Sequence, residues 1–155
     1  MRVFPLLAVA GLALAACSPT APRGADQSVM DQAVSKAIGD PNTCVLVLKP
    51  GTAEVVYRYG SFATCGRILP ACSTPGTLTA EALGKAAAAG DVRAASCDTL
   101  ADGSRRVGWA SGPVPQTEAA EHDPLVYAAV MEGPSVLPGR EIKARLEPAL
   151  VRAGM

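Results

Sequence analysis

Residues 43–59 read Thr-Cys-Val-Leu-Val-Leu-Lys-Pro-Gly-Thr-Ala-Glu-Val-Val-Tyr-Arg-Tyr. The part from Thr43 to Lys49 is an almost unbroken apolar run, which is typical of a buried strand. Pro50-Gly51 is a turn pair, and residues 53–59 alternate as a second strand would. The stretch therefore predicts a β-hairpin.

Three more strands are predicted downstream. Residues 92–99 and 104–114 flank Ala101-Asp102-Gly103, and Asp-Gly favours a tight hairpin turn because glycine accepts a positive φ. Residues 125–132 form the fifth apolar run. Along the fourth strand, Gly108, Ala110 and Gly112 share one face, which leaves room for another element to lie against it.

Helical patterns surround these strands. Residues 26–38 carry apolar side chains at helical spacing, with Asp26 as a cap. A second helix starts at Thr77 or Thr79 and runs to about Ala89, and a third starts near Pro138. Residues 60–76, rich in Gly, Pro, Ser and Thr, are expected to be a loop. The order predicts a single α+β domain over residues 26–155, with a five-stranded antiparallel sheet flanked by N-terminal, middle and C-terminal helices.

The N-terminal segment has the layout of an export signal. Arg2 supplies a positive charge, and residues 3–14 are apolar but too short to span a bilayer as a stable helix. Leu14-Ala15-Ala16-Cys17 resembles the lipobox of bacterial lipoproteins. The resemblance implies cleavage after residue 16, a diacylglycerol on the Cys17 thiol and acylation of the new amino terminus; the alternative is an ordinary secretory signal cleaved nearby.

The predicted lipoprotein would be held at a membrane through Cys17. Residues 17–25 are expected to be the lipidated cysteine and a flexible tether, because this stretch is rich in Ser, Pro, Thr, Ala and Gly. Position 18 is Ser, whereas Asp would resemble an inner-membrane retention signal. This favours the outer membrane, with the domain facing the periplasm.

The charge balance excludes one class of partner. Removing Arg2 from the 14 basic residues leaves 13 against 14 acidic ones in the mature chain. A nearly neutral protein lacks the basic excess typical of nucleic-acid binding. We therefore expect no nucleic-acid partner.

Four cysteines remain after Cys17. An even number in an exported domain predicts two disulfides, and none of the four forms a Cys-x-x-Cys pair. Three pairings are possible. We favour Cys65 with Cys72, as a local staple, and Cys44 with Cys97.

The order of elements resembles serine β-lactamases and penicillin-binding transpeptidases, which share a five-stranded sheet. Residues 67–76, Arg-Ile-Leu-Pro-Ala-Cys-Ser-Thr-Pro-Gly, resemble the Pro-Ala-Ser-Thr stretch around the nucleophile of class D β-lactamases. Residues 107–112 resemble the Gly-Trp-x-x-Gly strand of that family, and residues 127–131 match the position of its last strand. The resemblance implies a scaffold of this kind, with Ser73 as the candidate catalytic residue.

The catalytic motifs of that family are missing. Its Ser-x-x-Lys motif places a lysine one helical turn after the serine, as the proton acceptor. Here Ser73 is followed at that spacing by Gly76, and aligning Cys72 with the serine gives Pro75. The Lys-Thr-Gly motif is also absent. The same order of elements resembles profilin-like and roadblock-like sheets, which bind partners, so fold alone does not assign a function.

Each of the other candidate sites could have either a functional or a purely structural role. Trp109 and Tyr57 could form a binding platform, although strand aromatics usually pack in a core. Arg105 and Arg106 could hold a carboxylate bidentately or be solvated at a hairpin end. A set of Ser73, His122 and Asp123 can be written down as a triad, but adjacent His and Asp rarely make one.

No metal or cofactor site is predicted. Glu118, Glu121, His122 and Asp123 form an acidic loop that more often is solvated than ligating. The leading hypothesis is a lipid-anchored, non-catalytic binding or assembly module of the cell envelope, with an envelope protein or peptidoglycan as partner. The alternatives are a degenerate penicillin-interacting serine hydrolase using Ser73 and a purely structural envelope lipoprotein.

Overall fold

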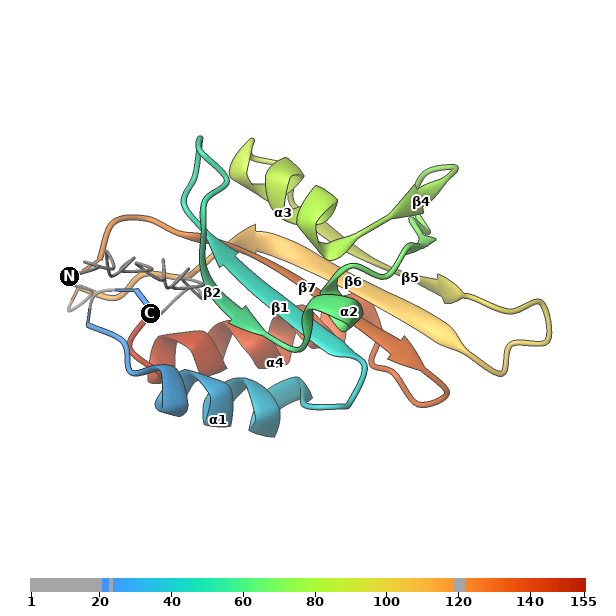
Figure 1. Cartoon of the computed structure of the whole chain (residues 1–155), viewed down its shortest axis with the longest axis horizontal. Coiled ribbons are helices and arrows are strands. Elements are labelled where there is room, and N and C mark those ends of the chain that lie inside the picture. The colour runs from blue at the N-terminus through green and yellow to red at the C-terminus, as the bar shows by residue number, and fades with distance from the viewer. Residues whose placement is uncertain (1–20, 23, 119–121) are drawn as a thin grey trace, which may run out of the picture.

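A computed structural model describes residues 21–22, 24–118 and 122–155 (Figure 1). The predicted leader and Cys17 lie outside the described residues. The fold is α+β with a five-stranded antiparallel sheet, as predicted, and the strand order within the sheet is β2-β1-β7-β6-β5. Its strands are β1 (Thr43–Leu48), β2 (Val55–Tyr59), β5 (Arg93–Asp98), β6 (Arg106–Pro113) and β7 (Val126–Gly133). The three predicted helices are α1 (Gln27–Ile38), α3 (Ala80–Ala88) and α4 (Gly139–Arg152).

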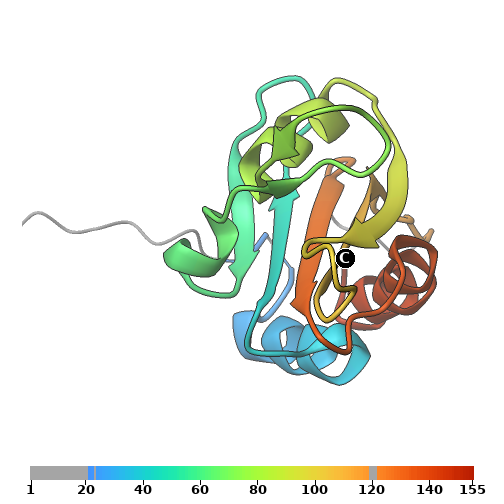
Figure 2. The same ribbon diagram turned by 90° about the vertical axis from the view of Figure 1, so that its right-hand side faces the viewer.

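The central strands are covered on both faces. Every residue of β1 and β7 is buried, because side chains that alternate along a strand enter two separate apolar clusters. Helices α1 and α4 lie side by side on one face, and α3 lies on the other (Figures 1 and 2). The first cluster includes Val45, Val47, Tyr127 and Ala129, and the second includes Leu46, Leu48, Ala128 and Val130.

Helix α4 begins directly on the glycine-rich face of β6. A Cβ added to Gly108 would lie 2.3 Å from the Leu137 carbonyl oxygen, and one added to Gly139 would lie 2.2 Å from the Trp109 carbonyl oxygen. Both distances are far below contact, so glycine permits this close approach. The element predicted to lie against the small residues of this strand is therefore α4.

The expected loop over residues 60–76 contains regular structure. Helix α2 (Phe62–Cys65) is followed by β3 (Leu69–Pro70), which pairs with β4 (Thr77–Leu78). Helix α3 has nine residues and is too short to cover its face of the sheet alone. Cys65 and Leu69 are buried in the same apolar cluster as α3, so this segment covers the remainder.

Two disulfides are present, but the pairing favoured from the sequence is wrong. The bonds join Cys44 to Cys65 and Cys72 to Cys97. Cys44 lies on β1 and Cys97 on β5, with β7 and β6 between them. Three strand spacings amount to about 14 Å, beyond the roughly 7 Å between Cα atoms that a disulfide can span.

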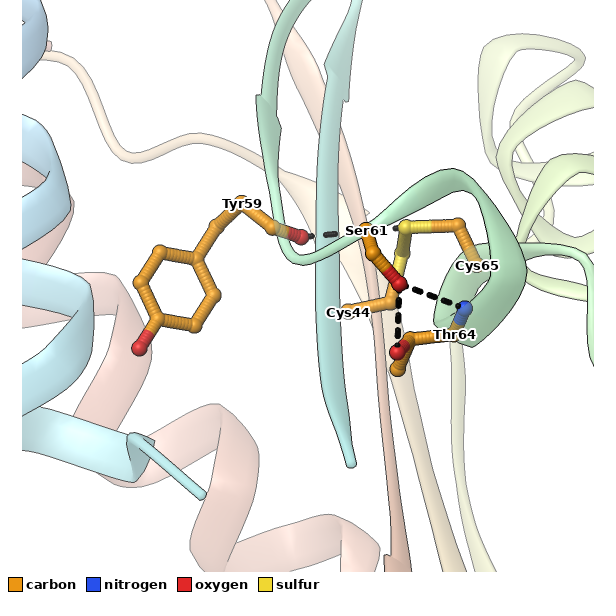
Figure 3. Close-up of a disulfide and its surroundings, with 5 residues drawn as sticks. All are labelled: Cys44, Tyr59, Ser61, Thr64 and Cys65. Carbon is orange, nitrogen blue, oxygen red and sulfur yellow. Dashed lines mark hydrogen bonds between the residues drawn. A yellow bond between two sulfur atoms is a disulfide. The ribbon is translucent and has the colours of Figure 1, made fainter. Parts of the chain in front are cut away.

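Each disulfide instead attaches the segment after β2 to a different strand. Figure 3 shows the first bond, between Cys44 of β1 and Cys65 at the end of α2. The Ser61 hydroxyl oxygen caps this short helix by accepting from the Thr64 N–H at 3.0 Å. The second bond holds the turn between β3 and β4 against the edge strand β5. The two bonds therefore hold the covering segment at two separate points.

The described part of the expected tether is not free of the domain. Ala21 and Ala25 are partly buried against the cluster that α1 and α4 cover. Gly24 lies beside Gly154, since a Cβ added to Gly154 would be 3.6 Å from the Gly24 carbonyl oxygen. Packing against the core therefore includes residues before Asp26. Among the described residues, no helix combines the length and apolarity needed to cross a membrane.

We predict that Gly108→Ala lowers the free energy of unfolding by about 1–3 kcal/mol, because the added methyl group meets backbone rather than a movable side chain. Gly112→Ala is the matched control on the same strand face. A Cβ there would be 3.3 Å from the flexible Lys143 Nζ. Urea unfolding followed by circular dichroism measures both. Equal destabilisation by the two variants would contradict the close packing of α4 on β6.

Candidate functional site

The two aromatic residues proposed as a binding platform are both core residues. Trp109 is fully buried, and its indole N–H donates to the Pro70 carbonyl oxygen at 2.8 Å. Tyr57 is also buried and donates its hydroxyl to Asp31 Oδ1 at 2.8 Å. Burial, and then the hydrogen bond to Asp31, raises the pKa of Tyr57 well above its usual range. The structure gives neither ring a surface to offer a ligand.

Arg105 does hold a carboxylate bidentately, but the carboxylate belongs to this chain. Its Nε and Nη2 donate to the two oxygens of Glu132, each at 2.7 Å. Arg67 Nη1 lies 2.6 Å from Glu132 Oε2. The Glu132 side chain is only 3% exposed, so one buried carboxylate is shared by two partly exposed guanidinium groups.

The Glu132 cluster, defined by Arg67, Arg105 and Glu132, ties the covering segment to the sheet. Glu132 is on β7, Arg105 precedes β6, and Arg67 lies between α2 and β3. The Arg105 hydrogen bonds lower the pKa of Glu132 in opposition to burial, and the charge of Arg67 lowers it further. The cluster is therefore ionised and internally satisfied, with a structural role.

Arg106 is also paired within the chain. Its Nε lies 2.9 Å from Asp98 Oδ1 across the β5–β6 hairpin, and both side chains are about half exposed. Such surface pairs contribute little to stability. The two arginines that the sequence offered for one ligand carboxylate therefore bind two different carboxylates of the chain.

The structure does not bring the candidate triad together. Ser73 lies on an exposed turn beside Cys72, whose disulfide partner Cys97 is opposite Val107 near the start of β6. His122 lies beyond the other end of β6, and its Nδ1 is 2.8 Å from the Asp123 backbone carbonyl oxygen rather than from a carboxylate.

The acidic loop does not gather ligands in the part of the chain that can be described. Glu121 lies outside that part, whereas Glu118, His122 and Asp123 lie within it. No group of three or more His, Cys, Asp or Glu side chains there could hold a metal ion.

Two large apolar side chains project from the covering segment. Phe62 on α2 is 73% exposed and Ile68 just before β3 is 71% exposed, the two largest values among the exposed large hydrophobic residues described. The Arg58 guanidinium lies over the Phe62 ring at 3.8 Å from its centroid. We call Phe62 and Ile68 together the α2 surface. A sequence signal was available for Phe62, which stands alone among small and polar residues, whereas Ile68 is followed directly by Leu69.

The backbone that carries the α2 surface is attached to the sheet at two points. The Cys44–Cys65 disulfide lies three residues after Phe62, and Arg67 in the Glu132 cluster directly precedes Ile68. Restraining the backbone in advance reduces the entropy lost on binding. The arrangement is therefore suited to contact with another macromolecule.

A groove lies between α1 and α4 on the opposite face of the molecule. Its volume is about 490 Å³, and short side chains such as Ala33, Ala37 and Ala144 leave the space open. Its lining combines apolar side chains with the basic side chains of Lys36, Arg145 and Arg152. The complete lining is Val29, Gln32, Ala33, Lys36, Ala37, Ala144, Arg145, Pro148 and Arg152. The sequence analysis missed this site, because it emerges only when the two helices, over a hundred residues apart in the chain, are placed together.

Comparison with known proteins gives no relative. No family model, no curated protein and no solved structure matches the chain. Any functional conclusion therefore rests on the residues themselves.

We predict that Glu132→Gln lowers the free energy of unfolding by about 1–3 kcal/mol at neutral pH, because it removes charged hydrogen bonds from a buried acceptor. The pKa of Glu132 is lower in the folded state than its ordinary value of 4.5. Its contribution is therefore present above pH 4.5 and is lost as the pH falls through the folded pKa. The wild type and the variant should converge as the pH is lowered below 4.5.

Asp98→Asn is the control, because it breaks an arginine–carboxylate pair that is exposed. Its effect should stay below about 1 kcal/mol at any pH. Urea unfolding between pH 7 and pH 3 makes the comparison. A pH-independent difference between the wild type and Glu132→Gln would contradict the ionised cluster.

Proposed function

We propose that this chain is the precursor of a bacterial lipoprotein, anchored through lipid on Cys17, and that its mature domain is a non-catalytic binding or assembly module of the cell envelope. The lipobox-like Leu14-Ala15-Ala16-Cys17 supports the anchor. Two disulfides indicate an extracytoplasmic, oxidising compartment. The membrane proposed is the outer membrane, with the domain facing the periplasm.

The single observation that carries the binding role is the α2 surface. Phe62 and Ile68 are each more than two thirds exposed, although the backbone beneath them is held by a disulfide and the Glu132 cluster. Aromatic side chains such as Phe62 are enriched in protein interfaces relative to the rest of the protein surface. They are less suited to peptidoglycan, whose glycan and short peptides are predominantly polar. An envelope protein is therefore the preferred partner.

The anchor is tested by Cys17→Ala. We predict that the wild-type chain incorporates labelled palmitate and stays with membranes washed in high salt, whereas the variant incorporates none and is released by high salt as soluble protein or remains as unprocessed precursor. The physical reason is that the thioether can form only at the Cys17 thiol, and the acyl chains supply the membrane affinity. Palmitate labelling that persists in the variant would contradict the lipobox.

The binding role is tested by crosslinking and affinity recovery from solubilised envelopes. We predict that Phe62→Ser with Ile68→Ser abolishes a specific crosslinked partner that the wild type retains. The matched control is Val92→Ser with Leu100→Ser, which removes two other exposed apolar side chains of 55% and 47% exposure. Equal loss in both double variants, or no loss in either, would contradict a role for the α2 surface.

The same preparations distinguish the alternatives. Covalent labelling by a fluorescent penicillin, lost in Ser73→Ala, would support the serine hydrolase instead. Binding to purified peptidoglycan, without a protein partner, would indicate that peptidoglycan is the partner instead of an envelope protein.

A further inference from the structure

We propose that the groove between α1 and α4 seats the headgroups of anionic phospholipids, so that the domain lies with this helical face against the membrane that anchors it. The inference rests on the proposed lipidation of Cys17. It adds a second contact with the membrane, made by side chains of the folded domain.

The groove has the chemistry of an amphiphile site. Val29, Ala33, Ala144 and Pro148 form apolar parts of its lining, and Val29 is 48% exposed. Lys36, Arg145 and Arg152 supply the charged parts, and no acidic side chain lines it. A phosphate would lie among the cations, while glycerol and the adjoining methylenes would contact the apolar parts of the lining.

Two of the three basic side chains have no acidic partner among the described residues. Arg145 pairs with Glu141 one turn earlier on α4, but the ion pairs formed there include neither Lys36 nor Arg152. The mature sequence as a whole is nearly neutral, with 13 basic residues after Arg2 is removed and 14 acidic ones. The groove is therefore a local concentration of positive charge on a protein that has no overall basic excess.

The place of the groove relative to the anchor selects the membrane as its occupant. Ala21, which packs on the core, follows Cys17 by four positions, and four residue steps can span at most about 14 Å. Ala21 is on the same chain segment as Gly24, which lies beside Gly154, two residues after Arg152. Lipid on Cys17 would therefore hold the Arg152 end of the groove close to the headgroups.

The rest of the groove is within electrostatic reach of the same surface. Antiparallel α1 and α4 place Val29 and Arg152 at the tether end, and Lys36 lies seven residues further along α1. Seven helical residues rise about 10 Å, which is similar to the screening length at physiological ionic strength. Tilting the helical face toward the membrane brings all three cations to the headgroups.

The test uses the mature-length chain with Cys17→Ser, exported so that its disulfides form, so no acyl chain contributes to binding. Binding is measured by sedimentation with vesicles of phosphatidylcholine alone and of an equal mixture with phosphatidylglycerol. We expect binding only to the mixed vesicles, weakening as salt is raised. Each basic side chain at an anionic surface adds about fivefold, so Lys36→Gln/Arg145→Gln/Arg152→Gln should lower the partition coefficient roughly 100-fold.

The matched control is Lys49→Gln/Lys85→Gln/Arg93→Gln, which removes three positive charges elsewhere and should bind nearly as the wild type does. Ala144→Glu keeps all the cations but puts a carboxylate in the lining of the groove, and it should also weaken binding. Equal binding to both kinds of vesicle, or equal loss in both triple variants, would overturn the proposal. An acidic protein that crosslinks to the groove without vesicle binding would also overturn it.

The lipidation of Cys17 and the binding of lipid headgroups by the groove are tested by separate assays, so either can fail without the other. Palmitate labelling reports on Cys17 alone, whereas the vesicle assay uses protein that cannot be lipidated.

Discussion

Burial of the central strands on both faces is the constraint on which the rest of the fold depends. Strands β1 and β7 expose no residue, so each face of the sheet needs its own cover. On one face α1 and α4 provide it, and the glycines at 108 and 139 let α4 begin almost in contact with the backbone of the sheet. On the other face α3 is short and built largely from alanine. Something else must complete that layer.

The segment after β2 completes it, and it has little apolar content of its own. It contributes Cys65 and Leu69 to the core and depends on covalent and ionic attachment for its position. The two disulfides, the indole hydrogen bond of Trp109 and the shared carboxylate of Glu132 each fix a different point along it. This explains why a small domain with few aromatic residues carries two disulfides. It also explains why Phe62 and Ile68 can remain exposed on well-ordered backbone.

The fold could be predicted from the sequence because each main element has a strong local signal. The run at 43–49, the Asp-Gly turn at 102–103 and the helical spacing after Asp26 each predict the element that is observed. The disulfide pairing could not be predicted, because it depends on strand order. Cys44 and Cys97 are candidates for pairing only until β7 and β6 are seen to lie between them.

The candidate sites were harder to predict than the fold for a related reason. Arg105 was proposed to bind the carboxylate of a ligand, and in the structure it binds a carboxylate of the same chain in a bidentate manner. Its partner, Glu132, is 27 residues away and becomes adjacent only through strand pairing. Trp109 was proposed as part of a binding platform, but its indole is buried on the face of the sheet opposite the glycines of the same strand, which pack against α4. The basic groove required two helices from opposite ends of the chain.

One face of the sheet is closed by a segment that two disulfides attach to different strands. Peptide mapping of the non-reduced protein tests it most directly. Trypsin cleaves after Arg58, Arg67 and Lys85, so the four cysteines fall in four separate peptides. We predict linked peptides joining Cys44 to Cys65 and Cys72 to Cys97. A linkage between Cys65 and Cys72, or free thiols at these positions, would contradict the account.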